Sequence, residues 1–379
     1  MDSEFVIVGD GVAGSSAARI LTETAPEATV TVVTAEDEPL YNRILIKELA
    51  KGKMPEEAVG IHDVAWYDDR QIDLRLDTRV ETVDVNADTD DVHTLWTIEH
   101  ARRLREAARE GDRGVVIGAG LLGLDMAAIL AVHDVDARYL MRGTRWWRYA
   151  MSETGAEIIH ETLREHGVEP VFESGVDGFL TTDGELDGVR DTNGRTYEAD
   201  LATVAVGTDP NTGFLEDTPV DLDSGVLVDE YMHTGVPGVY AAGDVARHYD
   251  SILGDRVRNG SWDSAQQQGV VAAHNMLDPK SQAFDCVPTY SVDHFEFPFL
   301  SFGHPTTGET YAERTYDDRE WRRLAFRDDC LVGGVLVGDL APQRTYKRLI
   351  RSQRPVADRT ESLLARDVRA GDVVPAMAD

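Results

Sequence analysis

The chain has 379 residues, with 37 basic and 69 acidic side chains and a formal net charge of −32. This length allows two or three domains with well-buried cores, and the charge argues against nucleic acid as a partner because phosphates would be repelled. Since no apolar run is long enough to span a bilayer and Met1 leads almost directly into the first predicted strand, we expect a cytoplasmic protein without a signal peptide or a membrane anchor.

The acidic residues are spread through patterned sequence, which is typical of a folded surface and not of a disordered tail. Salt at 1 M shortens the Debye length to about 3 Å and would screen the repulsion among these charges. A halophilic source is therefore our hypothesis, and full stability in salt-free buffer would contradict it.

Residues 5–8 predict a short apolar strand, and Gly9, Gly11 and Gly14 follow it in the spacing G-x-G-x-x-G before a helix of small residues. In this pattern one glycine forms a tight turn, one lets the backbone approach a pyrophosphate, and one lets the helix pack closely on the strand. A second strand is expected at 29–34. Glu36 follows at the distance where an acid would hold a ribose hydroxyl, with Asp37 as the alternative.

The next segments are a loop that enters a helix near residue 45, a strand-rich stretch to about residue 85, an acidic turn and an amphipathic helix over 97–109. A second strand, at 114–117, then precedes Gly118, Gly120 and Gly123 in the same glycine spacing. Two such loops imply two dinucleotides, and a flavin reduced by a nicotinamide is the commonest reason to hold both.

The strand expected at 137–140 is followed by Met141, where an acid would bind the ribose of NADH. Arg142 comes next, with Arg145 and Arg148 nearby. Guanidinium groups suit a 2′-phosphate, so the sequence favours NADPH over NADH, unless these arginines lie on a solvated turn.

A helix is expected over 153–166 and an apolar strand over 238–245, which ends in Gly243 and Asp244. Short alternating strands follow from about residue 287, and then two helices. The predicted fold class is α/β, with two Rossmann-like dinucleotide-binding domains and a small α+β C-terminal domain. The domain bounds are 1–110 with 208–285 for the first, 111–207 for the second and 286–379 for the third.

These motifs resemble those of the two-dinucleotide-fold flavoproteins of the pyridine nucleotide–disulfide oxidoreductase superfamily. The Tyr41-Asn42-Arg43 segment, the run at 206–211 and the segment 262–269 add to the resemblance. It is strongest to ferredoxin and rubredoxin reductases and to the flavin half of nitrite reductase large subunits. It implies FAD on the first glycine loop, NAD(P)H on the second, and a last domain of interface or dimerisation type, which allows a homodimer. It also places Arg43, Asp244 and Trp262 at the flavin.

The resemblance further implies that Lys47 and Asp125 meet near the flavin, where they would hold the ring electronics and the nicotinamide pose. Relatives carry Glu at the position of Asp125, and Asp is shorter by one methylene. The alternative is that Lys47 pairs with Glu48 on a helix face, while Asp125 is favoured by the helix dipole.

The chain departs from the family in two further places. Relatives have a further strand where this chain has a short acidic turn between Val85 and Val92, which would remove a wall beside FAD. The stretch 44–47 has no cysteine, which excludes a thiol relay there, and Cys286 and Cys330 are too far apart in sequence for a redox or metal motif. We expect both to be small core residues.

The sequence therefore predicts an FAD-dependent NAD(P)H oxidoreductase that passes electrons to an external acceptor such as a ferredoxin or rubredoxin. One alternative is an NAD(P)H oxidase, or a quinone or nitrite-pathway reductase, with a small acceptor. Another is a nucleotide-binding redox sensor that has lost FAD.

A basic stripe stands out in this acidic chain. Arg344, Lys347, Arg348 and Arg351 follow the spacing i, i+3, i+4 and i+7, which places them on one face of a helix. A solvated face is the ordinary explanation for such a pattern. Our hypothesis is that this stripe docks an acidic iron–sulfur electron carrier.

Overall fold

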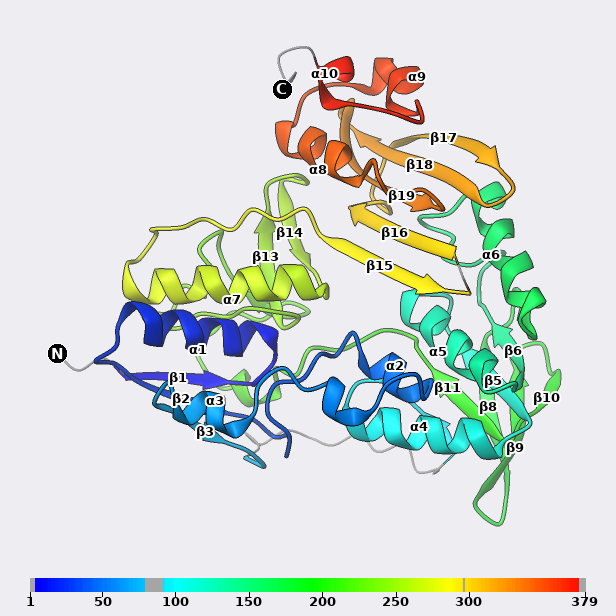
Figure 1. Ribbon diagram of the computed structural model, residues 1–379, viewed down its shortest axis with the longest axis horizontal. Helices are drawn as coiled ribbons and strands as arrows, with labels where there is room; N and C mark the ends of the chain where they lie inside the picture. Colours follow the sequence, from blue (N-terminus) through cyan, green and yellow to red (C-terminus); the bar gives the residue numbers. More distant parts are fainter. Residues whose placement is uncertain (1–3, 79–90, 296, 375–379) are drawn as a thin grey trace. The chain divides into compact units, whose positions relative to one another are not determined.

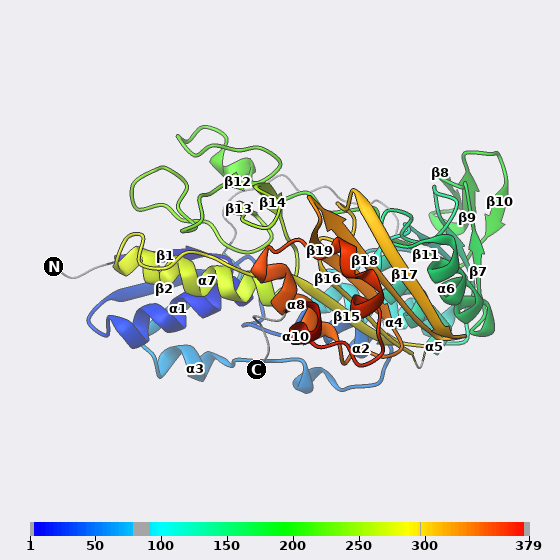
Figure 2. The ribbon, with the colours of Figure 1, turned by 90° about the horizontal axis from the view of Figure 1, so that it is seen from above.

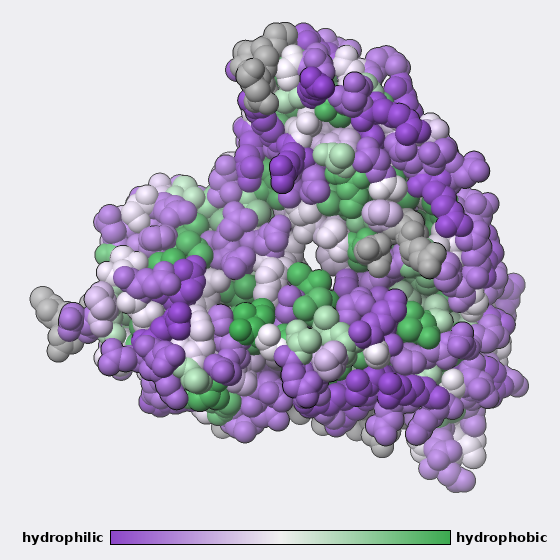
Figure 3. Space-filling view, in the orientation of Figure 1, coloured by the Kyte–Doolittle hydropathy of each residue, from purple (hydrophilic) through white to green (hydrophobic). Residues whose placement is uncertain are grey.

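The structure is a computed structural model that describes residues 4–78, 91–295 and 297–374. The chain divides into two compact units. The first comprises residues 1–42, 57–85 and 208–289, and the second comprises 43–56, 86–207 and 290–379. Within the described residues, no helix is both long enough and apolar enough to cross a bilayer. Hydrophilic residues dominate the face shown in Figure 3, as the net charge requires.

The first unit is built on a parallel sheet with the strand order β1-β2-β3. Its strands are β1 (Glu4–Val8), β2 (Thr29–Val33) and β3 (Ile72–Arg75). Helices α1 (Val12–Thr24) and α7 (Trp262–Leu277) lie side by side and bury their apolar residues with those of the sheet (Figures 1 and 2). The other face of β1 leaves Val6 and Val8 60% and 53% exposed.

The two helices of this unit approach closely because of one glycine. A Cβ added at Gly269 of α7 would lie 2.1 Å from the carbonyl oxygen of Ala13 on α1. Any other residue would therefore push α7 away from the first turn of α1, which carries the first glycine loop.

A second sheet of the first unit has the order β12-β13-β14, with β12 (Val226–Leu227), β13 (Ala246–Asp250) and β14 (Asp255–Arg258). The short helices are η1 (Glu56–Ala58), at the boundary of the two units, α3 (Val64–Asp68) and η2 (Gly213–Leu215).

The second unit contains a five-stranded parallel sheet with the order β4-β11-β5-β6-β7. The strands are β4 (Val92–His93), β5 (Arg113–Ile117), β6 (Asp136–Leu140), β7 (Val168–Val171) and β11 (Leu201–Val204). Helices α4 (Ile98–Glu110), α5 (Leu121–Val132) and α6 (Glu153–Glu165) connect them. Strand order reverses between β5 and β11, and in open parallel sheets ligands bind beyond the carboxyl ends of strands at such a point.

Two further sheets belong to the second unit. An antiparallel sheet is formed by β8 (Val176–Thr182), β9 (Glu185–Asp191) and β10 (Thr196–Glu198). The C-terminal part is a sheet with the order β15-β16-β19-β18-β17, made of β15 (Thr289–His294), β16 (Phe297–Gly303), β17 (Thr310–Asp317), β18 (Glu320–Arg327) and β19 (Cys330–Val337). The helices are α2 (Ile46–Ala50), α8 (Gln343–Ser352), η3 (Ala357–Arg359), α9 (Thr360–Leu363) and α10 (Ala370–Val373).

Most predicted elements are present, and the helix predicted over 97–109 is α4. Thr97 caps this helix, since its side chain accepts a hydrogen bond from the backbone of His100. Gly111 ends the helix as expected. The predicted acidic turn between Val85 and Val92 lies almost wholly outside the described residues.

Two predicted strand regions are wrong. The segment 238–245 forms an isolated bridge at Tyr240 and then a turn. The reason is that Gly243 adopts φ +85° and its N–H donates to the side chain of Gln268 and not to a neighbouring strand. Between residues 50 and 78, β3 is the one strand that the structure describes. Part of this stretch forms helix α3 instead, and the side chain of Asp63 caps that helix.

Candidate functional site

The first glycine loop joins β1 to α1. Gly9 has φ +100°, which favours glycine, and a Cβ at Gly14 would lie 2.0 Å from the carbonyl oxygen of Gly9. A Cβ at Gly11 would meet no atom within 4 Å. Gly11 is also the N-cap of α1, and no side chain caps the helix there. The loop therefore leaves room and free helix N–H groups where a pyrophosphate would bind, which fits a dinucleotide.

The second glycine loop joins β5 to α5 with the same geometry. Gly118 has φ +115°, and a Cβ added there would lie 2.1 Å from the carbonyl oxygen of Ala205, just after β11. A Cβ at Gly123 would lie 2.0 Å from the carbonyl oxygen of Gly118, whereas one at Gly120 would meet nothing within 4 Å. This loop fits a second dinucleotide for the same reasons.

The surroundings of the first loop include a carboxylate that the sequence analysis missed. Asp10, between two of the glycines, is 7% exposed and accepts hydrogen bonds from the hydroxyl of Tyr67 at 2.9 and 2.7 Å. Burial and the charge of Asp10 raise the pKa of Tyr67 well above its ordinary value. Tyr67 therefore remains a neutral donor that holds Asp10.

Glu36, the predicted ribose acid, lies just after β2 and is half-buried. Its carboxylate accepts a hydrogen bond of 2.5 Å from the hydroxyl of Tyr41. Asp37, the alternative, is exposed. A carboxylate held at the carboxyl end of the second strand is in the position from which a ribose is bound in such folds.

The Gly243–Asp244 turn is packed between the two helices of the first unit. A Cβ at Gly243 would lie 3.3 Å from that of Ala13 on α1 and 3.9 Å from that of Ala265 on α7. Asp244 is half-buried, and a Cβ at Gly260 would lie 3.3 Å from its carboxylate. Trp262, also half-buried, begins α7.

The second glycine loop accepts hydrogen bonds from β6 and from the loop that follows this strand. The hydroxyl of Tyr139 and the indole N–H of Trp146 each donate to the carbonyl of Gly120 at 3.3 Å. The guanidinium of Arg145 donates to the carbonyls of Met151 and Arg148 at 2.9 and 3.2 Å, so it supports the loop.

Other residues of the same loop face different surroundings. Arg142 is exposed and Met141 is buried. Arg148 is exposed and donates to the hydroxyl of Tyr149 at 2.6 Å. Of the two arginines proposed for the cofactor, Arg142 is therefore the exposed one.

Lys47 and Asp125 meet in the second unit, as the resemblance implies. Asp125 on α5 is 4% exposed, and its Oδ1 lies 3.3 Å from Nζ of Lys47 on α2. The Nε2–H of His294 donates to the same oxygen, and the hydroxyl of Tyr290 donates to Oδ2 at 2.6 Å. The missing methylene of aspartate therefore does not prevent the pair.

These donors explain the charge of Asp125. Burial raises the pKa of Asp125, but the hydrogen bond from His294, the charge of Lys47 and the hydrogen bond from Tyr290 together hold it below its ordinary value of 3.8. Burial and the charge of Asp125 raise the pKa of Tyr290 well above its ordinary value. Asp125 is thus a carboxylate at neutral pH and Tyr290 is a neutral donor.

His294 and Tyr290 were missed in the sequence. Their signal is the alternation along β15, where Tyr290, Val292 and His294 share one face of the strand. Lys51, which contacts His294 at 2.8 Å, stands four residues after Lys47, one helical turn away.

Arg43 contacts a tryptophan of its own unit. Its Nη1 donates to the carbonyl of Trp96 at 2.8 Å, and its guanidinium lies 5.4 Å from the centre of the indole ring. Its assignment to the flavin stays a prediction.

The predicted basic stripe is formed on α8. Arg344, Arg348 and Arg351 are exposed and Lys347 is half-buried. The opposite side of the helix is apolar and buries Tyr346, Leu349 and Ile350. The helix therefore presents its cations away from the core, as the spacing predicts.

The two cysteines differ in burial. Cys286 is buried, as predicted for a small core residue, whereas Cys330 is only partly buried. Burial and the charges of Asp328 and Asp329 raise the pKa of the Cys330 thiol, which makes it a weaker nucleophile. Within the described part of the chain, no group of three or more His, Cys, Asp and Glu residues could hold a metal ion.

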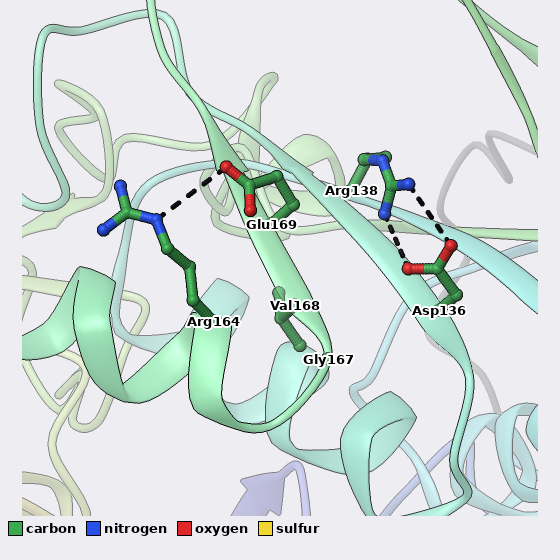
Figure 4. Close-up of a pocket in the computed structure, with 6 residues that line it drawn as sticks. All are labelled: Asp136, Arg138, Arg164, Gly167, Val168 and Glu169. Carbon is green, nitrogen blue, oxygen red and sulfur yellow. Dashed lines mark hydrogen bonds and ion pairs between the residues drawn. The ribbon is translucent and has the colours of Figure 1, made fainter.

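A small pocket lies at the amino ends of β6 and β7 (Figure 4). Its arginines are paired within it, Arg138 with Asp136 at 2.7 Å and Arg164 with Glu169 at 3.8 Å. The second glycine loop follows the carboxyl end of β5, so this pocket is at the opposite edge of the sheet and is not the dinucleotide site.

Replacing Asp125 with Asn should destabilise the protein by about 3 to 5 kcal/mol at neutral pH, because it leaves the largely buried ammonium of Lys47 without its carboxylate. In the folded protein the pKa of Asp125 is below 3.8. The contribution of Asp125 to the free energy of unfolding is therefore complete above that pH and is lost only as the pH falls further. Urea unfolding should therefore show the same difference in the free energy of unfolding between wild type and variant down to about pH 4. As a control, Asp73→Asn removes an exposed pair with Arg75 and should cost less than about 1 kcal/mol. A comparable loss in both variants would contradict the prediction.

Comparison with known proteins places this geometry in a family. Nitrite reductase (NAD(P)H) of Bacillus subtilis (strain 168) is 24% identical over 94% of this chain, which spans 48% of that protein. The ferredoxin–NAD(+) reductase component of the anthranilate 1,2-dioxygenase system of Burkholderia cepacia is 27% identical, over 82% of this chain and 84% of its own length. The covalent putidaredoxin reductase–putidaredoxin complex has the same fold, with a TM-score of 0.89 at 20% identity over 99% of this chain and 98% of that one.

The sequence model of the pyridine nucleotide-disulphide oxidoreductases matches residues 79–269, half of the chain. The predicted fold class, the cofactor classes FAD and NAD(P)H, and the enzyme class, an FAD-dependent NAD(P)H oxidoreductase, are confirmed. The chain belongs to the pyridine nucleotide-disulphide oxidoreductase family.

Proposed function

We propose that this enzyme takes electrons from NADPH and delivers them through FAD to an external iron–sulfur carrier. The observation that carries the proposal is the pair of glycine loops with matching geometry, each with an open middle glycine at a helix N-terminus. The first loop, with Glu36 and Asp244, would hold FAD, and the second would hold the nicotinamide nucleotide. Residues 1–110 with 208–285, 111–207 and 286–379 are the proposed FAD, NAD(P)H and C-terminal domains.

FAD, when bound, accepts a hydride and can release the two electrons singly. The chain's own contribution to hydride transfer is positioning, since that step needs no acid or base. Gly11 and Gly120 leave room for the phosphates. Lys47, paired with Asp125, would supply a cation to the bound nicotinamide.

An external acceptor follows from what residues 44–47 contain. They are Ile44, Leu45, Ile46 and Lys47, so this segment offers no thiol to receive electrons. The relative from Burkholderia cepacia is named as a ferredoxin–NAD(+) reductase component. The basic stripe on α8 would attract an acidic carrier to an otherwise acidic surface.

A second candidate is the electron-input part of a nitrite reductase. This chain spans only about half of the Bacillus subtilis nitrite reductase that it matches along 94% of its own length. The acceptor would then be a separate domain or subunit. Reduction of a ferredoxin would favour the first proposal, and reduction of a small dye but of no ferredoxin would favour the second.

The two middle glycines separate the two nucleotide sites. Gly11→Val should lower the flavin content of the purified protein, seen in its visible spectrum, while Gly120→Val should keep the flavin and raise the KM for NADPH. Neither should alter thermal stability, because each added side chain enters open space. A colourless wild-type protein would contradict the whole proposal, and equal flavin loss in both variants would contradict the assignment of the loops.

Arg142 is the proposed contact to the 2′-phosphate. Arg142→Ala should lower kcat/KM for NADPH by about 10-fold or more and leave that for NADH nearly unchanged, since charge-assisted hydrogen bonds contribute about 1.5 to 3 kcal/mol. Arg148→Ala is the matched control, because Arg148 is exposed on the same loop but bonds Tyr149. Wild-type selectivity for NADH would overturn the assignment.

The stripe on α8 is tested with two acceptors. Arg348→Glu with Arg351→Glu should slow reduction of an acidic ferredoxin by about 10-fold or more at low salt and spare a small dye. The control reverses Arg103 and Arg109, which are exposed on α4, and so changes the net charge equally. Equal losses with protein and dye, or in both double variants, would reject a docking role.

A further inference from the structure

A line of hydrogen-bonded ionisable side chains runs from Asp125 to the edge of the second unit. Asp125 accepts from Nε2 of His294, and Nδ1 of the same ring lies 2.8 Å from Nζ of Lys51. Lys51 in turn lies 2.9 Å from the carboxylate of Glu48. Asp125, His294 and Lys51 are each 4% exposed, whereas the side chain of Glu48 is 25% exposed.

The order of donors along this line fixes the state of the imidazole. A lysine ammonium has three donors and no acceptor, so Nδ1 of His294 accepts when Lys51 is charged. The ring proton is then on Nε2, and this N–H donates to Asp125, which accepts as a carboxylate. A second ring proton would aim an N–H at the ammonium.

The formal charges along the line balance in this state. Lys47 and Lys51 carry two positive charges, Asp125 and Glu48 carry two negative charges, and a neutral His294 adds none. Among the described residues, Tyr290 on β15 and Tyr139 on β6 are neutral groups near the line, and Lys53, His133 and Arg109 lie near its Lys51 end, where Lys53 and Arg109 are exposed. Burial lowers the pKa of Lys51, while the hydrogen bond and charge of Glu48 oppose the loss of its proton.

The contacts of Asp125 with its donors differ in length. Both carboxylate oxygens of Asp125 have close donors, His294 on Oδ1 and Tyr290 at 2.6 Å on Oδ2. The contact with Lys47 is longer, at 3.3 Å. Asp125 is therefore the anchor of Lys47, and Lys47 can shift toward a bound nicotinamide while it stays in contact with Asp125.

We propose that Lys51 and His294 are positioning residues, with Lys51 setting the imidazole tautomer that fixes Asp125 as the carboxylate anchor of Lys47. The contribution of this unit to turnover rests on the proposed function. Its geometry and protonation do not, so they can be tested separately.

The first test is nitrogen NMR of the His294 ring in the purified protein without nicotinamide. Wild type should show the neutral ring with its proton on Nε2 at neutral pH, because the Lys51 ammonium faces Nδ1. Lys51→Met keeps the length and removes the ammonium that faces Nδ1, so the His294 ring of this variant should take up a second proton, on Nδ1, more readily than the wild-type ring. Lys53→Met, at an exposed lysine two residues away, should behave as wild type.

The second test is the pH profile of the reaction with NADPH and ferricyanide, a small acceptor. Lys51→Met should gain an ionisation that lowers kcat about 10-fold at acid pH. The double variant Lys51→Met, His294→Gln should lose that ionisation, because the amide still donates to Asp125 and cannot titrate. A packing defect would persist in the double variant.

The outcomes separate the two proposals. Three NMR results would overturn the positioning unit. They are another tautomer of His294 in wild type, an imidazolium in wild type, and a His294 ring in Lys51→Met that takes up a second proton no more readily than the wild-type ring. If the NMR results hold but NADPH reduces no acceptor, the proposed function fails and the tautomer assignment stands. If both hold but Lys51→Met and Lys53→Met have the same pH profile, the unit has no role in turnover.

Discussion

The second unit depends on one buried carboxylate. Asp125 is almost inaccessible to water, and it keeps its charge because donors from two other segments meet it, Lys47 on α2 with His294 and Tyr290 on β15. An unpaired carboxylate at this position would cost several kcal/mol. Residues separated by as many as 169 positions along the chain are therefore packed together with a strict requirement on geometry. The same requirement supplies the site with an anion that does not move.

The two glycine loops show how one backbone pattern serves in different surroundings. In each, the first glycine has a positive φ, the last packs on the first, and the middle one faces open space. Their supports differ, since Asp10 bonds Tyr67 in the first loop and ring donors of Tyr139 and Trp146 hold a carbonyl of the second. The pattern thus determines where phosphates can bind, while neighbouring side chains determine how rigidly the loop is held.

Local signals in the sequence predicted the glycine loops, the capped helix α4 and the basic stripe, since each depends on spacing within a few residues. The contact between Lys47 and Asp125 came from the resemblance, because no local pattern brings such distant residues together. Tyr290, His294 and Lys51 could not be assigned without the packing of β15 and α2 on α5. The strand predicted over 238–245 was wrong because an apolar run does not reveal that Gly243 bonds a side chain. The halophilic source and the domain bounds stay predictions.

The valines of β1 have a consequence for the behaviour of the protein in solution. Val6 and Val8 are more than half exposed, and among the described residues β1 pairs with β2 alone. An apolar strand with an open edge is a template on which a second chain can add a strand. Each chain carries a net charge of −32, so electrostatic repulsion keeps two copies apart. Colloidal stability is then electrostatic, and a buffer near the isoelectric point of about 4.6 would remove the barrier to edge-to-edge association.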